Sequence, residues 1–68
     1  MDEELFNNQI RAFLKKVGIT AHREIEAAVR SALENGGLEG GETLQASMTL
    51  DVPALALHIE IGEDIRLE

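Results

Sequence analysis

Gly36-Gly37-Leu38-Glu39-Gly40-Gly41 divides the 68-residue chain into two parts whose apolar residues follow different periods. Four of the six glycines lie in this stretch, so it is too flexible to hold a fixed arrangement of side chains. A phosphate-binding loop needs a strand before it and a helix after it, and the order of patterns here is the reverse. We therefore predict a Gly-rich linker over residues 36–42.

Before the linker, apolar residues recur every three or four positions, which is typical of amphipathic helices. The first such series predicts a helix over about 3–17, with Asp2 as its N-cap and Gly18 at the left-handed stop position. The second predicts a helix over about 21–35 that begins after Thr20. Because the connection is only two or three residues long, the two helices should form an αα-hairpin.

After the linker, the apolar period changes to two, which is typical of a half-buried strand. The first alternating run covers residues 43–52, and alternation resumes after Pro53, which cannot donate to a strand ladder. The pattern predicts an antiparallel β-hairpin over about 43–67. Gly62 marks either a bulge in the second strand or a turn into a third one, and the unbroken alternation favours the bulge.

Together these elements predict one α+β domain over residues 1–68, with two helices packed on a β-hairpin in ααββ order and two layers. Such a short chain has no cysteine and only two aromatic residues, so neither disulfides nor a large aromatic core can stabilise it. An isolated hairpin also leaves two strand edges free. A homodimer with a four-stranded sheet would answer both needs.

The net charge of −7 is distributed unevenly. Residues 1–35 hold five basic and six acidic side chains, a net of −1, whereas residues 36–68 hold one basic and seven acidic side chains, a net of −6. The acidic half should repel nucleic-acid phosphates. The first residues lack the basic and apolar regions of a signal peptide, and no apolar run approaches a membrane span, so we expect a small acidic cytoplasmic protein without membrane contact.

The histidines offer the only metal-like pattern in the sequence. His58 and Glu60 stand at i and i+2 on one strand face and could share a metal ion or a proton, possibly across a dimer. Two ligands do not make a metal site, so a solvent-facing polar pair is the preferred interpretation. Adjacent carboxylates and isolated serines give no catalytic pattern, and we expect no enzymatic activity, no cofactor, no metal and no small-molecule ligand.

A helix-turn-helix interpretation rests on residues 14–20, which join the two predicted helices and carry local basic charge. Acidic residues are interleaved among the arginines of the second helix, so nucleic-acid binding through these helices is the alternative rather than the preferred hypothesis. The basic residues Arg11, Lys15 and Lys16 could instead meet an acidic protein surface, although an ordinary solvated face explains them equally well.

Nearly the whole chain resembles a family of short bacterial proteins catalogued as a domain of unknown function. The segments that carry the resemblance are residues 1–4, 6–7, 13–20, 23–26, 41–44 and 48–50. The resemblance implies a bacterial cytoplasmic origin and a small stand-alone domain, and it brings no catalytic residue, cofactor or substrate.

The sequence therefore does not define a function. The preferred hypothesis is a small non-enzymatic interaction protein that binds itself or an unknown protein partner through a strand edge or a helix face. The residues assigned to a candidate interaction surface are Arg11, Lys15, Lys16, His58 and Glu60.

Overall fold

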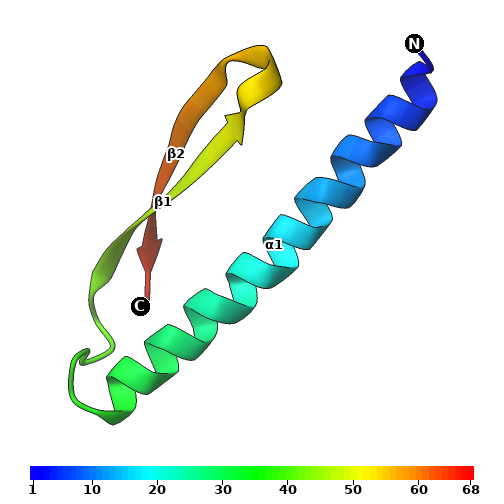
Figure 1. Cartoon of the computed structure of the whole chain (residues 1–68). Helices are drawn as coiled ribbons and strands as arrows, with labels where there is room; N and C mark the ends of the chain where they lie inside the picture. The colour runs from blue at the N-terminus through cyan, green and yellow to red at the C-terminus, as the bar shows by residue number, and fades with distance from the viewer. The chain divides into compact units, whose positions relative to one another are not determined.

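The computed structural model describes residues 1–68 and contains one long helix followed by one β-hairpin (Figure 1). The chain divides into two units, residues 1–37 and residues 38–68. The elements in chain order are the α-helix α1 (Glu3–Glu34), strand β1 (Thr43–Val52), the short 3-10 helix η1 (Pro53–Leu55) and strand β2 (Leu57–Arg66).

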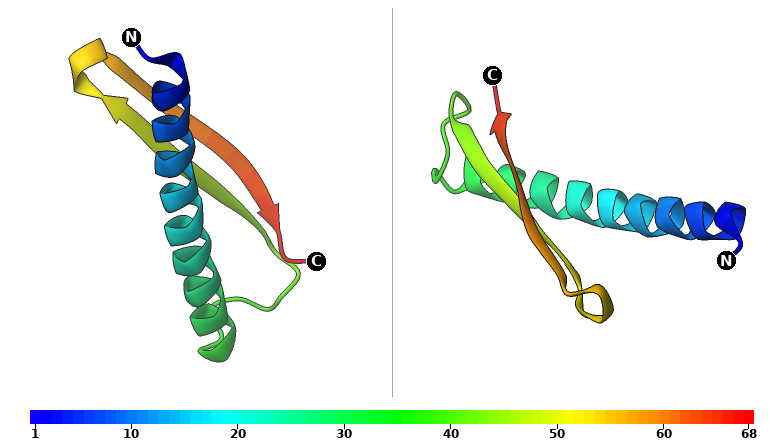
Figure 2. Two further views of the ribbon diagram at one scale, coloured as in Figure 1. Left: turned by 90° about the vertical axis from the view of Figure 1, so that its right-hand side faces the viewer. Right: turned by 90° about the horizontal axis from the view of Figure 1, so that it is seen from above.

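The predicted pair of helices is wrong, because α1 runs without interruption for 32 residues (Figure 2). Neither Gly18 nor Thr20 breaks it. The predicted αα-hairpin, with its ααββ order and its two-helix layer, is therefore wrong, and a single helix precedes the hairpin. At about 1.5 Å per residue, α1 is about 48 Å long.

Gly18 fails to end the helix because its energetic cost is small. A glycine in a helix interior costs only about 1 kcal/mol relative to alanine, and Lys15, Lys16 and Arg23 nearby are strong helix formers. The apolar spacing also continues across the glycine, from Val17 to Ala21. The backbone of Gly18 is helical, without a positive φ, and a Cβ atom placed there meets nothing within 4 Å.

Both ends of α1 carry capping signals in the sequence. The predicted N-cap is confirmed, since the Asp2 carboxylate accepts a hydrogen bond of 3.0 Å from the Leu5 backbone N–H. At the other end, Gly36 takes a left-handed φ of 84° and the Gly37 N–H donates to the Ala32 carbonyl at 2.8 Å. This is the 6→1 hydrogen bond of a Schellman motif, and it ends the helix after Glu34.

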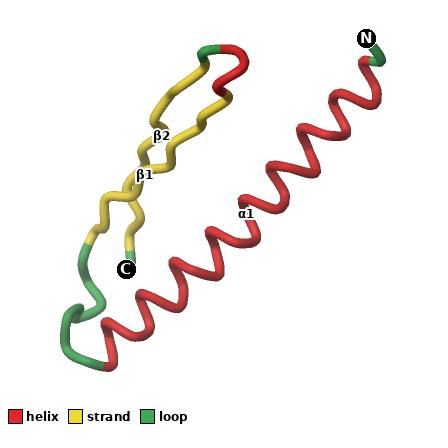
Figure 3. The backbone as a smooth tube through the Cα atoms, viewed as in Figure 1, coloured by secondary structure: helices red, strands yellow, loops and turns green.

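β1 and β2 form a two-stranded antiparallel sheet, coloured yellow in Figure 3. The register pairs Thr43 with Arg66 at the open end and Val52 with Leu57 at the closed end. Directly opposite residues share a face, so one face is apolar. Its cross-strand pairs are Leu44–Ile65, Ala46–Glu63, Met48–Ile61, Leu50–Ile59 and Val52–Leu57.

The bulge expected at Gly62 is wrong, and so is the alternative of a turn into a third strand. Gly62 pairs with Ser47 within an unbroken register, and β2 continues to Arg66. The strands are instead connected at η1, where Ala56 adopts a left-handed φ of 52° and its N–H donates to the Pro53 carbonyl at 3.0 Å. Pro53 therefore lies in the connection and not in the ladder, as its missing N–H requires.

No side chain in the structure is fully buried, apolar or polar. Large apolar side chains are substantially exposed in both units, including Phe13 at 53% in α1 and Ile61 at 56% in β2. Amphipathic elements form, but neither unit encloses a hydrophobic core by itself. Stability therefore depends on contacts that cover these surfaces.

Candidate functional site

The most extended surface feature of α1 is its apolar stripe, the set of apolar residues that share one face of the helix. Its members are separated by three or four positions, which brings them to one side of a helix with 3.6 residues per turn. The stripe consists of Phe6, Ile10, Phe13, Leu14, Val17, Ala21, Ile25, Ala28 and Ala32.

Several residues of the stripe recur at a spacing of eleven positions. This long spacing is not apparent when the sequence is divided into two short helices. Phe6, Val17 and Ala28 form one series at this spacing, and Ile10, Ala21 and Ala32 form another. Eleven residues in three turns correspond to about 3.67 residues per turn, so the stripe follows the helix with only a slow right-handed drift. The two series that continue at this spacing across Gly18 indicate one helix rather than two.

The predicted basic residues lie on α1 but do not form a single cluster. Arg11 and Lys15 are neighbours at i and i+4, whereas Lys16 lies about 100° around the helix from Lys15. The Arg11 guanidinium donates to the Asn8 side-chain oxygen at 3.1 Å. Since α1 is continuous, the turn that a helix-turn-helix motif requires is absent from residues 14–20.

A small ion-pair network occupies the C-terminal half of α1. The Glu26 carboxylate lies 2.7 Å from the Arg30 guanidinium and 3.3 Å from Nε2 of His22. Arg30 holds the pKa of Glu26 below its ordinary value, through its hydrogen bonds and its charge, and His22 adds a smaller effect. All three side chains are exposed, so this network supports the helix locally and offers no enclosed site.

The predicted pair His58 and Glu60 lies on the polar face of the hairpin, where strand alternation places both side chains. Nδ1 of His58 lies 3.6 Å from the Asp51 carboxylate across the strands, and the His58 side chain is 72% exposed. Glu60 pairs with Thr49. The structure contains no group of three or more His, Cys, Asp or Glu residues placed to hold a metal ion.

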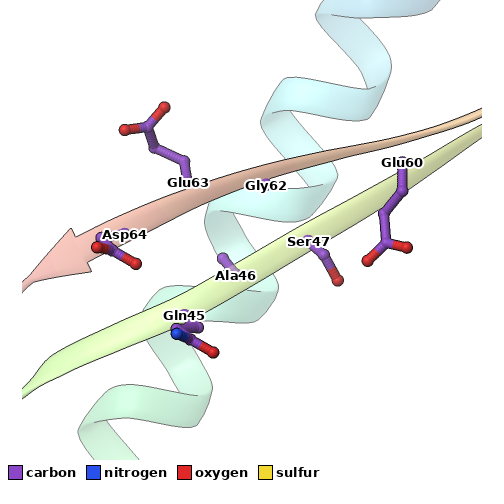
Figure 4. Close-up of a pocket in the computed structure, with 7 residues that line it drawn as sticks. All are labelled: Gln45, Ala46, Ser47, Glu60, Gly62, Glu63 and Asp64. Atoms are coloured by element: carbon purple, nitrogen blue, oxygen red, sulfur yellow. The ribbon is translucent and has the colours of Figure 1, made fainter.

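A shallow concave surface on the hairpin is lined by three acidic residues, Glu60, Glu63 and Asp64 (Figure 4). The carboxylates of Glu60 and Glu63 point in opposite directions, and Ser47 lies on the same side as Glu60. All three acidic side chains are exposed, and the only basic residue of the hairpin is Arg66. The surface can repel anions and attract cations, but it presents neither an activated nucleophile nor an enclosed volume.

Glu42 organises the end of the Gly-rich linker, a role that the sequence analysis missed. Its carboxylate accepts hydrogen bonds of 2.8 Å from the backbone N–H groups of Glu39 and of Gly40, whose φ is 109°. These two bonds lower the pKa of Glu42. The Leu67 N–H also donates to the Glu42 carbonyl at 3.1 Å, so residues 39–42 are held to the hairpin. The one sequence feature that could have predicted this role is a glutamate directly after Gly40-Gly41, where its carboxylate can reach the backbone N–H groups of the linker.

The five residues assigned to a candidate interaction surface therefore belong to different units. Arg11, Lys15 and Lys16 lie in α1, and His58 and Glu60 lie in β2. α1 also does not qualify as a membrane-spanning helix, despite its length, because charged side chains surround its apolar stripe.

The chain belongs to a family of unknown function, DUF6494, whose pattern covers residues 1–68. No match is found among curated proteins or among solved structures. The family supplies no named activity, so the function has to be argued from the surfaces of the chain itself.

Proposed function

We propose that this DUF6494 protein is a self-associating interaction protein, with a binding role rather than a catalytic one. Its apolar surfaces are covered by a second copy of the chain, and the assembled form is the functional state. The observation that carries this proposal is the complete lack of buried side chains in a chain that is rich in apolar residues.

Neither unit buries a side chain by its own fold. Large apolar side chains are exposed in each of them, among them Phe13 at 53% in α1 and Ile61 at 56% in β2. Covering these side chains by association would supply the hydrophobic stabilisation that neither unit obtains by itself.

The hairpin is likewise not expected to be stable by itself. Its two strands are both edge strands, and each leaves backbone N–H and C=O groups free along its outer side. Isolated two-stranded hairpins are only marginally stable in water. The bacterial cytoplasmic setting that the sequence predicts stays a prediction and is not needed for this proposal.

The test is the absolute mass of the purified protein in solution, measured by multi-angle light scattering over a wide concentration range. We expect twice the chain mass, or a higher multiple, at micromolar concentrations. A variant with Phe13→Glu, which places a charge on the apolar stripe, should move the mass toward that of one chain. Phe13 is exposed, so the substitution adds no buried charge within the chain. A chain that stays folded and monomeric at all concentrations contradicts the proposal.

A further inference from the structure

We propose that the apolar stripe of α1 binds the same stripe of a second copy in antiparallel orientation, with facing residues whose numbers add up to 38. This inference rests on the proposed self-association and specifies its surface and its geometry. The facing pairs are Phe6–Ala32, Ile10–Ala28, Phe13–Ile25 and Val17–Ala21, each formed twice across the two-fold axis.

Side-chain volume is the first argument for this register. The N-terminal half of the stripe carries large residues, and the C-terminal half carries three alanines, Ala21, Ala28 and Ala32. In the antiparallel register, each of these alanines faces a larger side chain. The combined volume therefore stays more even along the interface, and the two helix axes can keep one separation.

The parallel arrangement lacks this match. It places Phe6 against Phe6 at one end and Ala28 against Ala28 at the other. A separation wide enough for the phenylalanines would leave voids between the alanines, and voids in an apolar interface are costly. Antiparallel helices also align their macrodipoles favourably.

Charge identifies the helix, and not the hairpin, as the surface that binds a second copy. Residues 1–35 carry a net charge of −1, whereas residues 36–68 carry −6, so two hairpins brought together repel each other strongly. Glu63 moreover lies on the apolar face of the hairpin. On α1, Glu24 lies eleven residues after Phe13, on the edge of the stripe that Phe13 occupies, and in this register it faces Leu14; its side chain is exposed to solvent.

The eleven-residue repeat makes a long contact possible. A stripe with about 3.67 residues per turn drifts little relative to a straight helix, so two such stripes stay in contact with only slight right-handed supercoiling. The four facing pairs cover residues 6–32, which is nearly the full length of α1.

A double-mutant cycle at one facing pair tests the register. Ile10→Ala leaves a void against Ala28, and Ala28→Ile crowds Ile10, so each single variant should weaken the dimer at least tenfold. The double variant restores the pair and should return the dimer dissociation constant to within about threefold. Independent effects of the two substitutions would contradict the register, because residues 10 and 28 of parallel helices lie about 27 Å apart.

Ala12→Ile is the matched control for this cycle. It adds the same side chain at an α1 position outside the apolar stripe. The control should leave the dimer dissociation constant unchanged, since any general effect of isoleucine on helix propensity is present there as well.

Pulsed electron spin resonance distinguishes the two orientations directly, because the chain has no cysteine and accepts a single nitroxide label. In the antiparallel dimer, labels at Asn8→Cys are separated by about 33 Å along the helices, and labels at Arg23→Cys by about 12 Å. A parallel dimer gives similar, short distances at both sites and overturns the inference while the self-association stands. A monomeric mass with no dipolar signal at either site refutes both proposals.

Discussion

At the scale of single residues, the clearest electrostatic feature is Glu26, which contacts Arg30 and His22 at once. The pKa of Glu26 lies below its ordinary value, with Arg30 as the larger cause. Arg30→Gln should therefore raise the pKa of Glu26 toward the ordinary glutamate value, as followed by NMR titration of the side-chain carboxyl. His22→Gln is the matched comparison and should move that pKa less.

The sign of the pH effect follows from the lowered pKa. A carboxyl group whose pKa is lower in the folded state stabilises the fold above its unfolded pKa, and this contribution disappears as the pH falls through the folded value. Acidification should thus weaken the C-terminal half of α1 in the natural chain. If Arg30→Gln leaves the Glu26 titration unchanged, the ion pair does not persist in solution.

At the scale of elements, Gly18 is the point at which α1 differs from its predicted form. Gly18→Ala should stabilise the protein by about 0.5–1 kcal/mol, because alanine has the higher helix propensity and its Cβ meets no neighbour. Chemical denaturation followed by circular dichroism at 222 nm measures the change. A loss of stability would show that Gly18 needs a backbone conformation or a close contact that a continuous helix does not have.

Gly36→Ala is the control for this substitution, with the opposite expected sign. Gly36 has a φ of 84° in the Schellman motif, where an L-residue costs about 1 kcal/mol or more. The two glycines, one inside the helix and one after it, should therefore respond in opposite directions to the same change.

Local signals accounted for the ends of the elements but not for the continuity of the helix. Asp2, Asn35 and Gly36 mark the ends of α1, and the alternation of Leu44 through Val52 corresponds to β1. Gly18 followed by Thr20 resembles a helix stop and a new N-cap, but the cost of about 1 kcal/mol is too small to end a helix that keeps its apolar stripe. The eleven-residue spacing, which covers the whole helix, is the signal that decides between the two forms.

The proposed interaction surface was harder to predict for a similar reason. Lys15 and Lys16 were assigned to one surface because they are adjacent in sequence. Adjacent residues on a helix, however, point in different directions. The role of Glu42 depends on a hydrogen-bonded loop around Gly40, and no periodic pattern reports such a loop.

In the hairpin, a substitution at Gly62 tests whether β2 continues through this residue without a bulge. Gly62→Thr should stabilise the hairpin by about 0.5–1 kcal/mol, because a β-branched residue suits a strand and its Cβ would meet only the Ala46 carbonyl at 3.6 Å. Thermal unfolding compared with that of the natural chain measures the effect. Had Gly62 formed a bulge with a left-handed backbone, threonine would destabilise the hairpin instead.

At the scale of the whole molecule, the proposed self-association would make folding depend on assembly, because neither unit buries a side chain by itself. If a second copy covers the apolar stripe, dilution shifts the chain toward an unfolded monomer, and the thermal midpoint should rise by several degrees for each tenfold increase in concentration. The helical circular dichroism signal at low concentration should fall in the same way, because the helix obtains most of its stability from packing.

Phe13→Glu and Arg23→Glu separate this linkage from general effects of added charge. Both place a new carboxylate on α1, but Phe13 belongs to the apolar stripe and Arg23 does not. The first substitution should abolish the dependence of the thermal midpoint on concentration, and the second should retain it with a small shift. A midpoint that is independent of concentration in the natural chain would mean that the single chain is stable alone. The apolar stripe would then serve a contact other than one with a second copy.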